Sequence, residues 1–254
     1  MSDPVLMHSD LLERAGFVHG FFTRLGGVSQ GALASLNLSF TQGDEARNVE
    51  RNRELVRTSL DAQTLLLVGQ VHGTRVIVIA DQQQTRSISE QPPEADALVC
   101  SVPGVAIGVL TADCVPILLA DPCSGAVAAI HAGWRGTFDD APGAAVRSLC
   151  DEFGAKPGQI LAALGPSIGP ASYAVSPDLA RQFIGRFGSN VVDHGTAPRL
   201  DLWRANVLNL CRAGLDPQRI KVLAEDSFAQ PERFFSHRRD PNTGRQGSFI
   251  LPRR

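Results

Sequence analysis

Two patterns of apolar and polar residues alternate along the 254-residue chain. Continuous apolar runs rich in Val, Ile, Leu and Ala are typical of strands that are buried on both faces. Gly and Pro end or interrupt these runs, which predicts loops at those points. The runs lie at 65–80, 95–122, 126–137 and 160–175, and a shorter aromatic run opens the segment 21–40.

Other segments carry apolar residues at helical spacing. In 44–60, the apolar residues Val49, Leu55 and Val56 lie on one side among charged neighbours, which predicts an amphipathic helix. Similar patterns predict helices at 141–153, 177–188 and 201–215.

Two segments fit neither pattern. The polar stretch 82–94 contains prolines and predicts a surface loop, whereas 233–250 has two strand-like arms around Asp240–Gly244 and predicts a β-hairpin. Because strands and helices alternate irregularly, a mixed-sheet α/β or α+β architecture is favoured over a regular βαβ series. With 43% hydrophobic residues, we expect one large domain spanning 1–254.

Composition narrows the function classes. A net charge of −2, from 24 basic and 26 acidic residues, offers no summed positive potential for nucleic acid or an anionic membrane, so small molecules are the expected partners. No secretory signal or long apolar span is visible, which favours a cytoplasmic protein. The cysteines form no CxxC pair and are expected to be reduced; they are Cys100, Cys114, Cys123, Cys150 and Cys211.

One apolar run contains a surprising pair of polar residues. The stretch VLTADCVPIL places Asp113 and Cys114 where a strand is expected. A buried, unpaired carboxylate would cost several kcal/mol, so Asp113 needs a partner or access to water. Adjacent residues on a strand point to opposite faces, so the two share a site only if the strand bends or has ended, as Pro116 allows.

Two histidines share this setting with Cys114. His72 in QVHGT and His131 in IHAGW also lie in or beside apolar runs and precede small residues, which leave room for a ligand. Two imidazoles and a thiolate suit Zn²⁺ and leave a fourth tetrahedral position for water. Asp113 could then support a ring N–H or a bound water. The alternative is three ordinary core residues, because the spacing matches no local metal motif.

Arginines form a second candidate set. Guanidinium groups suit phosphate or carboxylate, and Arg135, Arg238 and Arg239 lie close to the polar motifs. Solvated surface positions are the alternative for all three.

Several motifs taken together resemble a known family. They are QVHGTRV, ADALV, TADCVPILLADP, AAIHAGWRGT, GPSIGPASYAV and FFSHRRDPNTGR. In this order they are similar to the laccase-domain family, also labelled polyphenol oxidoreductase, whose members have been read as purine nucleoside phosphorylases with adenosine deaminase activity. The resemblance covers nearly the whole chain.

The resemblance implies a fold, a site and a set of reactions. The fold would be a layered α/β/β/α sandwich, shared with the catalytic domain of cytotoxic necrotizing factor. The metal ligands would be His72, Cys114 and His131, holding zinc or, in some members, copper. The substrates would be phosphate and the nucleosides adenosine, inosine, guanosine and methylthioadenosine, and adenosine would also be deaminated. Asp113 is the candidate proton carrier, and the three arginines are the candidate phosphate ligands.

The chain also departs from the family pattern. Ala171, Ser172 and Ala174 stand where many relatives have two cysteines and a Glu, and Asp226-Ser227 replaces a Cys-Thr pair. His237 stands at a usual Tyr. These changes affect the expected purine preference and leave the three metal ligands intact.

Three rival interpretations use the same residues. Multi-copper oxidase chemistry needs many histidines, commonly as His-x-His pairs, and the six histidines here include no such pair. A metal-free enzyme would use Cys114 as nucleophile and His131 as base on an amide, but it has no obvious need for His72. A non-catalytic metal-buffering module would close the site with a fourth ligand, for which the candidates are His8, His19, His194 and His237. The expected assembly is a monomer or a small homo-oligomer.

Overall fold

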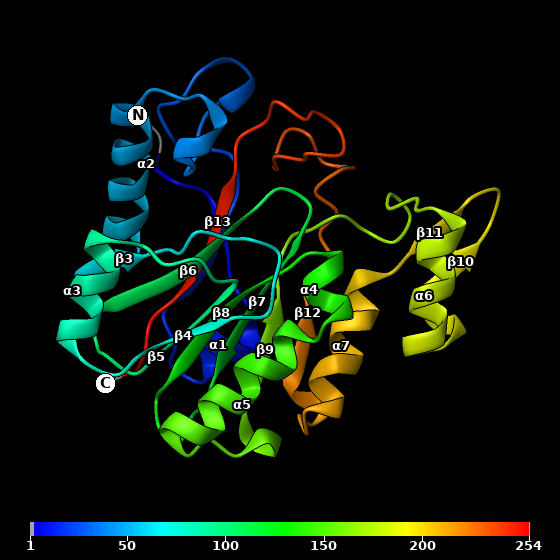
Figure 1. Cartoon of the computed structure of the whole chain (residues 1–254). Helices are drawn as coiled ribbons and strands as arrows, with labels where there is room; N and C mark the ends of the chain where they lie inside the picture. Colours follow the sequence, from blue (N-terminus) through cyan, green and yellow to red (C-terminus); the bar gives the residue numbers. More distant parts are fainter. Residues whose placement is uncertain (1–2, 254) are drawn as a thin grey trace.

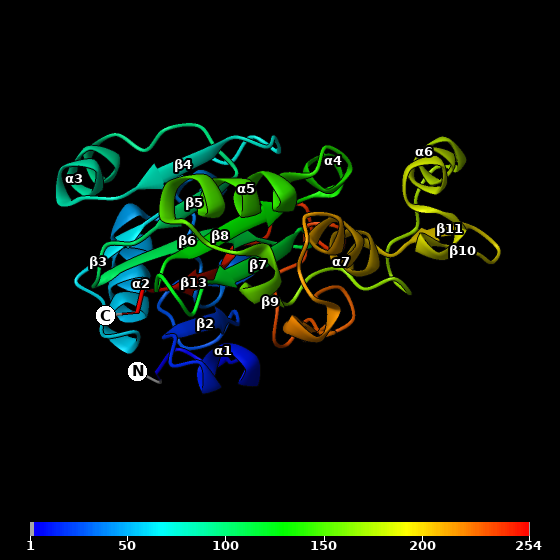
Figure 2. The same cartoon turned by 90° about the horizontal axis from the view of Figure 1, so that it is seen from below.

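Two β-sheets packed face to face form the centre of the molecule (Figures 1 and 2). The computed structural model describes residues 3–253. The first sheet has the order β1 (Leu6–Met7), β2 (His19–Phe22), β13 (Gln246–Ile250), β6 (Val105–Thr111), β3 (Thr64–Leu66). The second has the order β12 (Ile220–Val222), β9 (Leu161–Leu164), β7 (Val115–Ala120), β8 (Val127–Ala132), β5 (Ala97–Cys100), β4 (Val76–Ile79).

Both sheets are mixed. In the first, β3 runs parallel to β6 and the other neighbours are antiparallel. In the second, β4 and β12 run parallel to their neighbours, and the β7–β8–β5 and β7–β9 pairs are antiparallel. The continuous apolar runs thus form strands that are covered on both faces, which is typical of parallel and central strands.

Helices cover the two outer faces. Val56 and Leu60, in and just after α2 (Ala46–Ser59), pack with Phe22 and Phe249 of the first sheet. The opposite face carries α4 (Trp134–Phe138), α5 (Ala141–Phe153) and α7 (Leu202–Arg212). Buried residues of α5 and α7 join β7, β8 and β9 in one core, and the partly buried Trp134 and Phe138 of α4 pack against it. A separate core that includes Leu98, Ile107 and Leu118 fills the space between the sheets. The expected α/β/β/α layering is therefore confirmed.

Three smaller parts complete the fold. α1 (Asp10–Arg14) packs near β9, and α3 (Gln82–Glu90) contacts β3 and β4. The third sheet, β10 (Val192–His194) with β11 (Pro198–Leu200), lies with α6 (Pro177–Phe187) at one side of the molecule, away from the two main sheets (Figures 1 and 2). Within residues 3–253, no helix has the length and apolar composition needed to cross a membrane.

The predicted loop at 82–94 is wrong for most of its length, because residues 82–90 form α3. The Asp81 carboxylate accepts a hydrogen bond from the Gln84 amide, which caps the helix. Thr85 and Ile88 supply its buried face. The prolines lie beyond the helix, so they end the element rather than prevent it.

The predicted hairpin at 233–250 is also wrong, because only its second arm forms a strand. β13 pairs with β2 and β6 rather than with 233–239. Phe234 and Phe235 are fully buried without regular pairing. The Gln246 side chain instead bonds both backbone groups of Phe235, accepting at 2.8 Å and donating at 3.3 Å. Apolar burial alone therefore produced the strand-like pattern.

A candidate metal centre beside a cationic pocket

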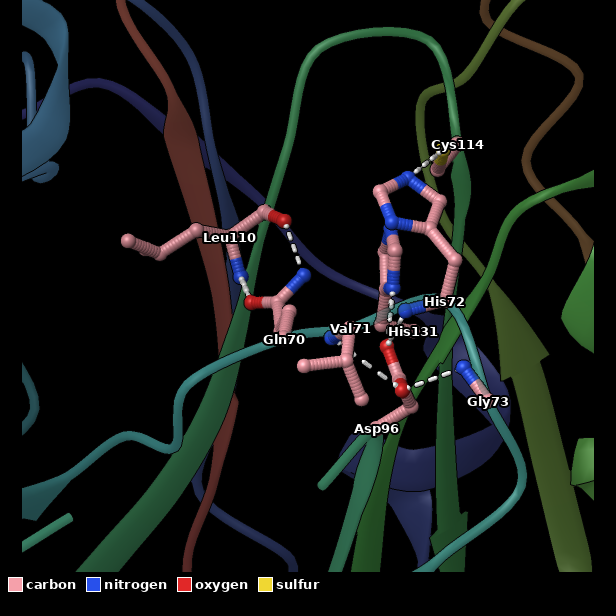
Figure 3. Close-up of polar contacts among 8 residues, drawn as sticks. All are labelled: Gln70, Val71, His72, Gly73, Asp96, Leu110, Cys114 and His131. Carbon is pink, nitrogen blue, oxygen red and sulfur yellow. Dashed lines mark hydrogen bonds and ion pairs between the residues drawn. The ribbon is translucent and has the colours of Figure 1, made fainter. Parts of the chain in front are cut away.

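Three side chains from separate segments meet at one point (Figure 3). His72 comes from the connection between β3 and β4, Cys114 directly precedes β7, and His131 lies in β8. Their possible ligand atoms all lie within 4.8 Å of one another. The Cys114 Sγ lies 3.9 Å from the His72 Nε2, and the two imidazole rings are 4.7 Å apart between centroids. The structure thus brings together the predicted triad His72/Cys114/His131.

Asp96 positions the segment that carries His72. Its carboxylate is fully buried at the start of β5 and accepts hydrogen bonds from the backbone amides of Val71 (3.3 Å), His72 (2.9 Å) and Gly73 (2.5 Å). Because β4 runs parallel to β5, the connection before β4 passes over the start of β5. His72 adopts a φ of 63°, a left-handed conformation that these three contacts stabilise.

The same carboxylate orients His131. The Asp96 Oδ1 lies 2.8 Å from the His131 Nδ1, so the Nε2 of that ring is left for the site (Figure 3). Burial by itself would raise the pKa of Asp96, but hydrogen bonds from His131 and Gly73 outweigh it and lower that pKa. Asp96 fills the supporting role that the sequence suggested for Asp113. ADALV is another apolar run with a carboxylate inside it, but nothing in that run indicates a contact with His131.

The electrostatics of the triad favour a thiolate. Burial opposes ionisation of Cys114, but His131 and His72 lower the pKa of its thiol to about 6. Burial likewise opposes protonation of His131, yet the Cys114 thiolate and Asp96 raise its pKa to about 9. Between these values the metal-free pair carries a thiolate and an imidazolium.

The geometry fits a tetrahedral metal ion. Zinc bonds of about 2.0–2.3 Å to nitrogen and sulfur imply ligand separations of roughly 3.3–3.6 Å. The Cys114 Sγ–His72 Nε2 separation is 3.9 Å and no pair exceeds 4.8 Å, so a bound ion requires only a small contraction of the triad. Gly133 keeps the site open, because a Cβ there would lie 3.0 Å from both the Cys114 Sγ and the His72 Cδ2. Within residues 3–253, the group contains no fourth His, Cys, Asp or Glu.

Asp113 lies next to the triad but is engaged elsewhere. It sits in the turn between β6 and β7 with a φ of 94°, so the strand has ended at this point, as the sequence required. Its Oδ1 accepts a hydrogen bond from the Ser227 hydroxyl at 2.8 Å, and its Oδ2 accepts one from the Arg238 amide at 2.6 Å. Asp113 therefore ties this turn to the segment 227–238.

The triad opens into a pocket of about 840 Å³. Arg53, Arg245 and His237 line it together with Gln70 and Thr111. Gln70 also fixes one wall, because its side chain donates to the Leu110 carbonyl and accepts from the Leu110 amide, each at 2.8 Å (Figure 3). The sequence predicted no functional role for Arg53, or for Arg245, which is the last residue of the motif FFSHRRDPNTGR.

The three predicted phosphate ligands do not line this pocket. Arg239 donates to the backbone carbonyls of Ser227, Phe228 and Phe234, so its guanidinium supports the loop. Arg238 donates to the Ala174 carbonyl and lies over Tyr173. Arg135 stacks on Trp134, with its Cζ 4.3 Å from the ring centroid.

The fold and the site define the class: a layered α/β protein with a His/Cys/His centre able to hold a metal. A family model described as "Multi-copper polyphenol oxidoreductase laccase" matches residues 18–253, and the chain belongs to this family. It is similar to a purine nucleoside phosphorylase from Deinococcus radiodurans (38% identity over 244 residues, covering 93% of this chain and 90% of the relative). A purine nucleoside phosphorylase from Bacteroides thetaiotaomicron is 32% identical over 247 residues, covering 92% and 91%.

Solved structures give the same result for the fold. The crystal structure of YlmD from Geobacillus stearothermophilus has a TM-score of 0.88 and 31% identity, covering 97% of this chain and 94% of that one. A Bacillus licheniformis protein described as hypothetical protein YfiH has a TM-score of 0.90 and 27% identity, covering 100% and 97%. The family and fold predicted from the motifs are therefore confirmed.

Proposed function

We propose that this protein is a purine nucleoside phosphorylase that acts on adenosine, inosine, guanosine and methylthioadenosine and also deaminates adenosine. The observation that carries the proposal is the His72/Cys114/His131 triad, held at the wall of a pocket large enough for a nucleoside. Relatives named purine nucleoside phosphorylase, similar over about nine-tenths of their length, support it.

Phosphorolysis transfers the ribosyl group from a purine to phosphate. A phosphate oxygen forms a bond to C1′ while the C1′–N9 bond breaks, and the electron pair and the phosphate proton end on the purine. The protein must therefore hold phosphate and nucleoside in line and bind the departing base. Deamination instead replaces the purine amino group with oxygen from water and releases ammonia.

The triad would hold the metal, and we propose Zn²⁺, with copper as the alternative ion. A bound Zn²⁺ supplies Lewis acidity at this wall of the pocket. Cys114 contributes its thiolate, and Asp96 keeps the His131 Nε2 aimed at the site. Asp113 remains the proposed proton carrier, in contact with the Ser227 hydroxyl.

A second function is favoured by one specific observation. The Cys114 thiol, whose pKa is lowered, would be the nucleophile and the His131 imidazole its base. The Asp96 carboxylate contacts His131 and would orient it. Such a set could hydrolyse an amide without metal. His72 separates the two proposals, because only the metal site needs a second imidazole.

Replacing His72 with Ala is the first test. We expect His72→Ala to lose bound metal and at least about 100-fold of nucleoside turnover together, because two ligands hold a metal poorly. Metal analysis is combined with turnover of adenosine and inosine, with and without phosphate, before and after chelation. His194→Ala, an exposed position in β10, is the control.

Each outcome bears on one part of the proposal. Product formation at the same rate without phosphate rules out phosphorolysis and leaves hydrolysis or deamination. A metal-free protein that hydrolyses amides, with activity retained in His72→Ala, replaces the metal site with the Cys/His enzyme.

A further inference from the structure

Two half-buried arginines in the pocket form no ion pair within the described residues. Arg53 projects from α2 and Arg245 directly precedes β13, and both line the pocket that contains the triad. Among the ion pairs formed within residues 3–253, neither guanidinium takes part in one. A partly desolvated cation without an anion is costly, so these positions are expected to serve a negatively charged ligand.

The backbone brings the two arginines together at one dipeptide. The Arg53 Nε donates to the Leu38 carbonyl at 2.9 Å. The Leu38 amide donates to the Arg245 carbonyl at 3.0 Å, and the Arg245 amide donates to the Asn37 Oδ1 at 3.0 Å. Two elements distant in sequence are thereby fixed on residues 37–38, and the arginine that each carries lines the same pocket.

Each guanidinium is held by part of its donors only. The Arg53 Nε donates to the Leu38 carbonyl, and the Arg53 Cζ lies 4.4 Å from the centroid of the Phe40 ring. The Arg245 Nη1 donates to the carbonyls of Thr243 and Gly244, each at 2.9 Å. These anchors reduce the side-chain entropy that ligand binding would otherwise cost. The remaining donors can form charge-assisted hydrogen bonds with an oxyanion.

Both arginines are partly desolvated yet keep their charge. Burial lowers the pKa of Arg53 to about 10, and burial also lowers the pKa of Arg245, against which Cys114 and Asp113 act in the opposite direction. Both arginines therefore stay charged at neutral pH although they are desolvated. Arg245 and Cys114 line the same pocket.

A buried hydroxyl in the same pocket lacks a partner. Thr111 is 2% exposed, lines the pocket, and its Oγ1 makes no hydrogen bond within the described structure. It ends β6 opposite Gln246, the residue next to Arg245, and it lies three residues before Cys114. A buried hydroxyl without a partner costs about 1–3 kcal/mol, which a bound oxyanion would recover.

We propose that Arg53, Arg245 and Thr111 form the seat for the orthophosphate co-substrate, between the triad and residues 37–38. The inference rests on the proposed phosphorylase function and moves its phosphate site away from Arg135, Arg238 and Arg239. The seat holds the dianion while one of its oxygens forms the bond to C1′ and its proton passes to the purine. The phosphate group of a nucleotide has the same chemistry, so the test must separate the two sources.

Direct binding of orthophosphate to the metal-loaded protein tests the seat. By calorimetry, we expect Arg245→Gln and Arg53→Gln each to raise the phosphate Kd by about 10-fold to 100-fold, and Thr111→Val by about 2-fold to 10-fold. Arg147→Gln, an exposed arginine on α5, is the matched control and should leave Kd unchanged. In turnover, the KM for phosphate should rise far more than the KM for inosine.

Each outcome supports or overturns the proposed phosphate seat. Unchanged phosphate binding in both arginine variants overturns the seat, as does a loss in Arg135→Gln instead. Arginine-dependent binding of adenosine monophosphate without binding of orthophosphate also overturns it. Arginine-dependent phosphate binding in a protein that turns over no nucleoside supports the seat and refutes the phosphorylase. If Arg245→Gln does not fold, Arg245→Lys and Thr111→Val, which keep charge or shape, carry the decision.

Discussion

Asp96 controls two of the three candidate metal ligands with one carboxylate. It bonds the His131 ring through one oxygen and shapes the backbone around His72. Such supporting groups fix the tautomer and direction of a ligand, and their loss typically costs 10-fold to 100-fold in metal affinity.

We therefore expect Asp96→Asn to weaken metal binding by about 10-fold to 100-fold, because an amide is a poorer acceptor for the His131 N–H and carries no charge. Chelator competition measures the affinity, and the visible absorption of the Co²⁺-loaded protein reports the ligand geometry. Asp121→Asn is the control, since Asp121 is 1% exposed and bonds only its own turn. An unchanged Co²⁺ spectrum and affinity would mean that Asp96 has only a structural role.

The residues of the site were partly predictable. Their chemistry singled out His72, Cys114 and His131, and the resemblance grouped them. Asp96 lies 35 residues from the ring that it bonds, and no local pattern reports such a contact. The sequence did show that Asp113 needed partners, but it could not show that these are Ser227 and Arg238.

At the scale of elements, the junction between β8 and α4 shapes the site. Gly133 caps α4 with a φ of −69°, a conformation open to any residue, so its need for glycine comes from space alone. The nearest atoms to an added Cβ belong to Cys114 and His72.

Gly133→Ala should therefore disturb the site and spare the fold. We expect a loss of about 1–3 kcal/mol in metal-binding free energy, as for other overpacked positions, with little change in the free energy of unfolding of the metal-free protein. Titration with metal and urea unfolding measure the two quantities. Gly185→Ala, inside α6 with no atom within 4 Å of the new Cβ, should leave metal binding unchanged. Equal metal affinity in Gly133→Ala and the unmodified protein would contradict this account.

Periodicity predicted the strongly amphipathic elements best. α2, α5, α6 and α7 all lie within the predicted helical segments. Periodicity did not predict α3, because its residues are mostly polar and only Thr85 and Ile88 are buried. The false hairpin arose because Phe234 and Phe235 are buried by packing while their backbone has no strand neighbour.

At the scale of the whole molecule, stacking of the two sheets decides which polar groups become buried. His19 in β2 is 1% exposed; its Nε2 accepts the Ser9 amide at 2.8 Å, and its Nδ1 faces the Phe17 carbonyl at 2.9 Å. Both nitrogens are thus occupied in the neutral ring. Burial lowers the pKa of His19 below its usual 6.5.

Stability should consequently fall on acidification. Below pH 6.5 the unfolded chain protonates His19 while the folded protein does not, so the free energy of unfolding decreases as pH falls towards the folded pKa. Protonation would leave the Ser9 amide without an acceptor, a cost of about 1–3 kcal/mol. Urea unfolding at pH 7.5 and 5.5 should show a larger loss in the unmodified protein than in His19→Gln. An identical loss in both would refute the assignment.

Strand order was beyond the reach of local patterns. Runs such as 65–80 predicted two strands, but nothing in them shows that β3 joins one sheet and β4 the other. The position of β13 between β2 and β6 likewise depends on contacts across more than a hundred residues. The α/β/β/α layering could be predicted only from the resemblance to a family.

The central place of β13 has a consequence for synthesis on the ribosome. Every strand of the second sheet lies between residues 76 and 222, so all of these strands and the triad leave the ribosome before β13 does. The first sheet keeps β2 and β6 apart, each with an open edge, until residues 246–250 have emerged. Those edges are sites for aggregation during translation, and the proposed phosphate seat, which needs Arg245, is the last part of the pocket to be completed.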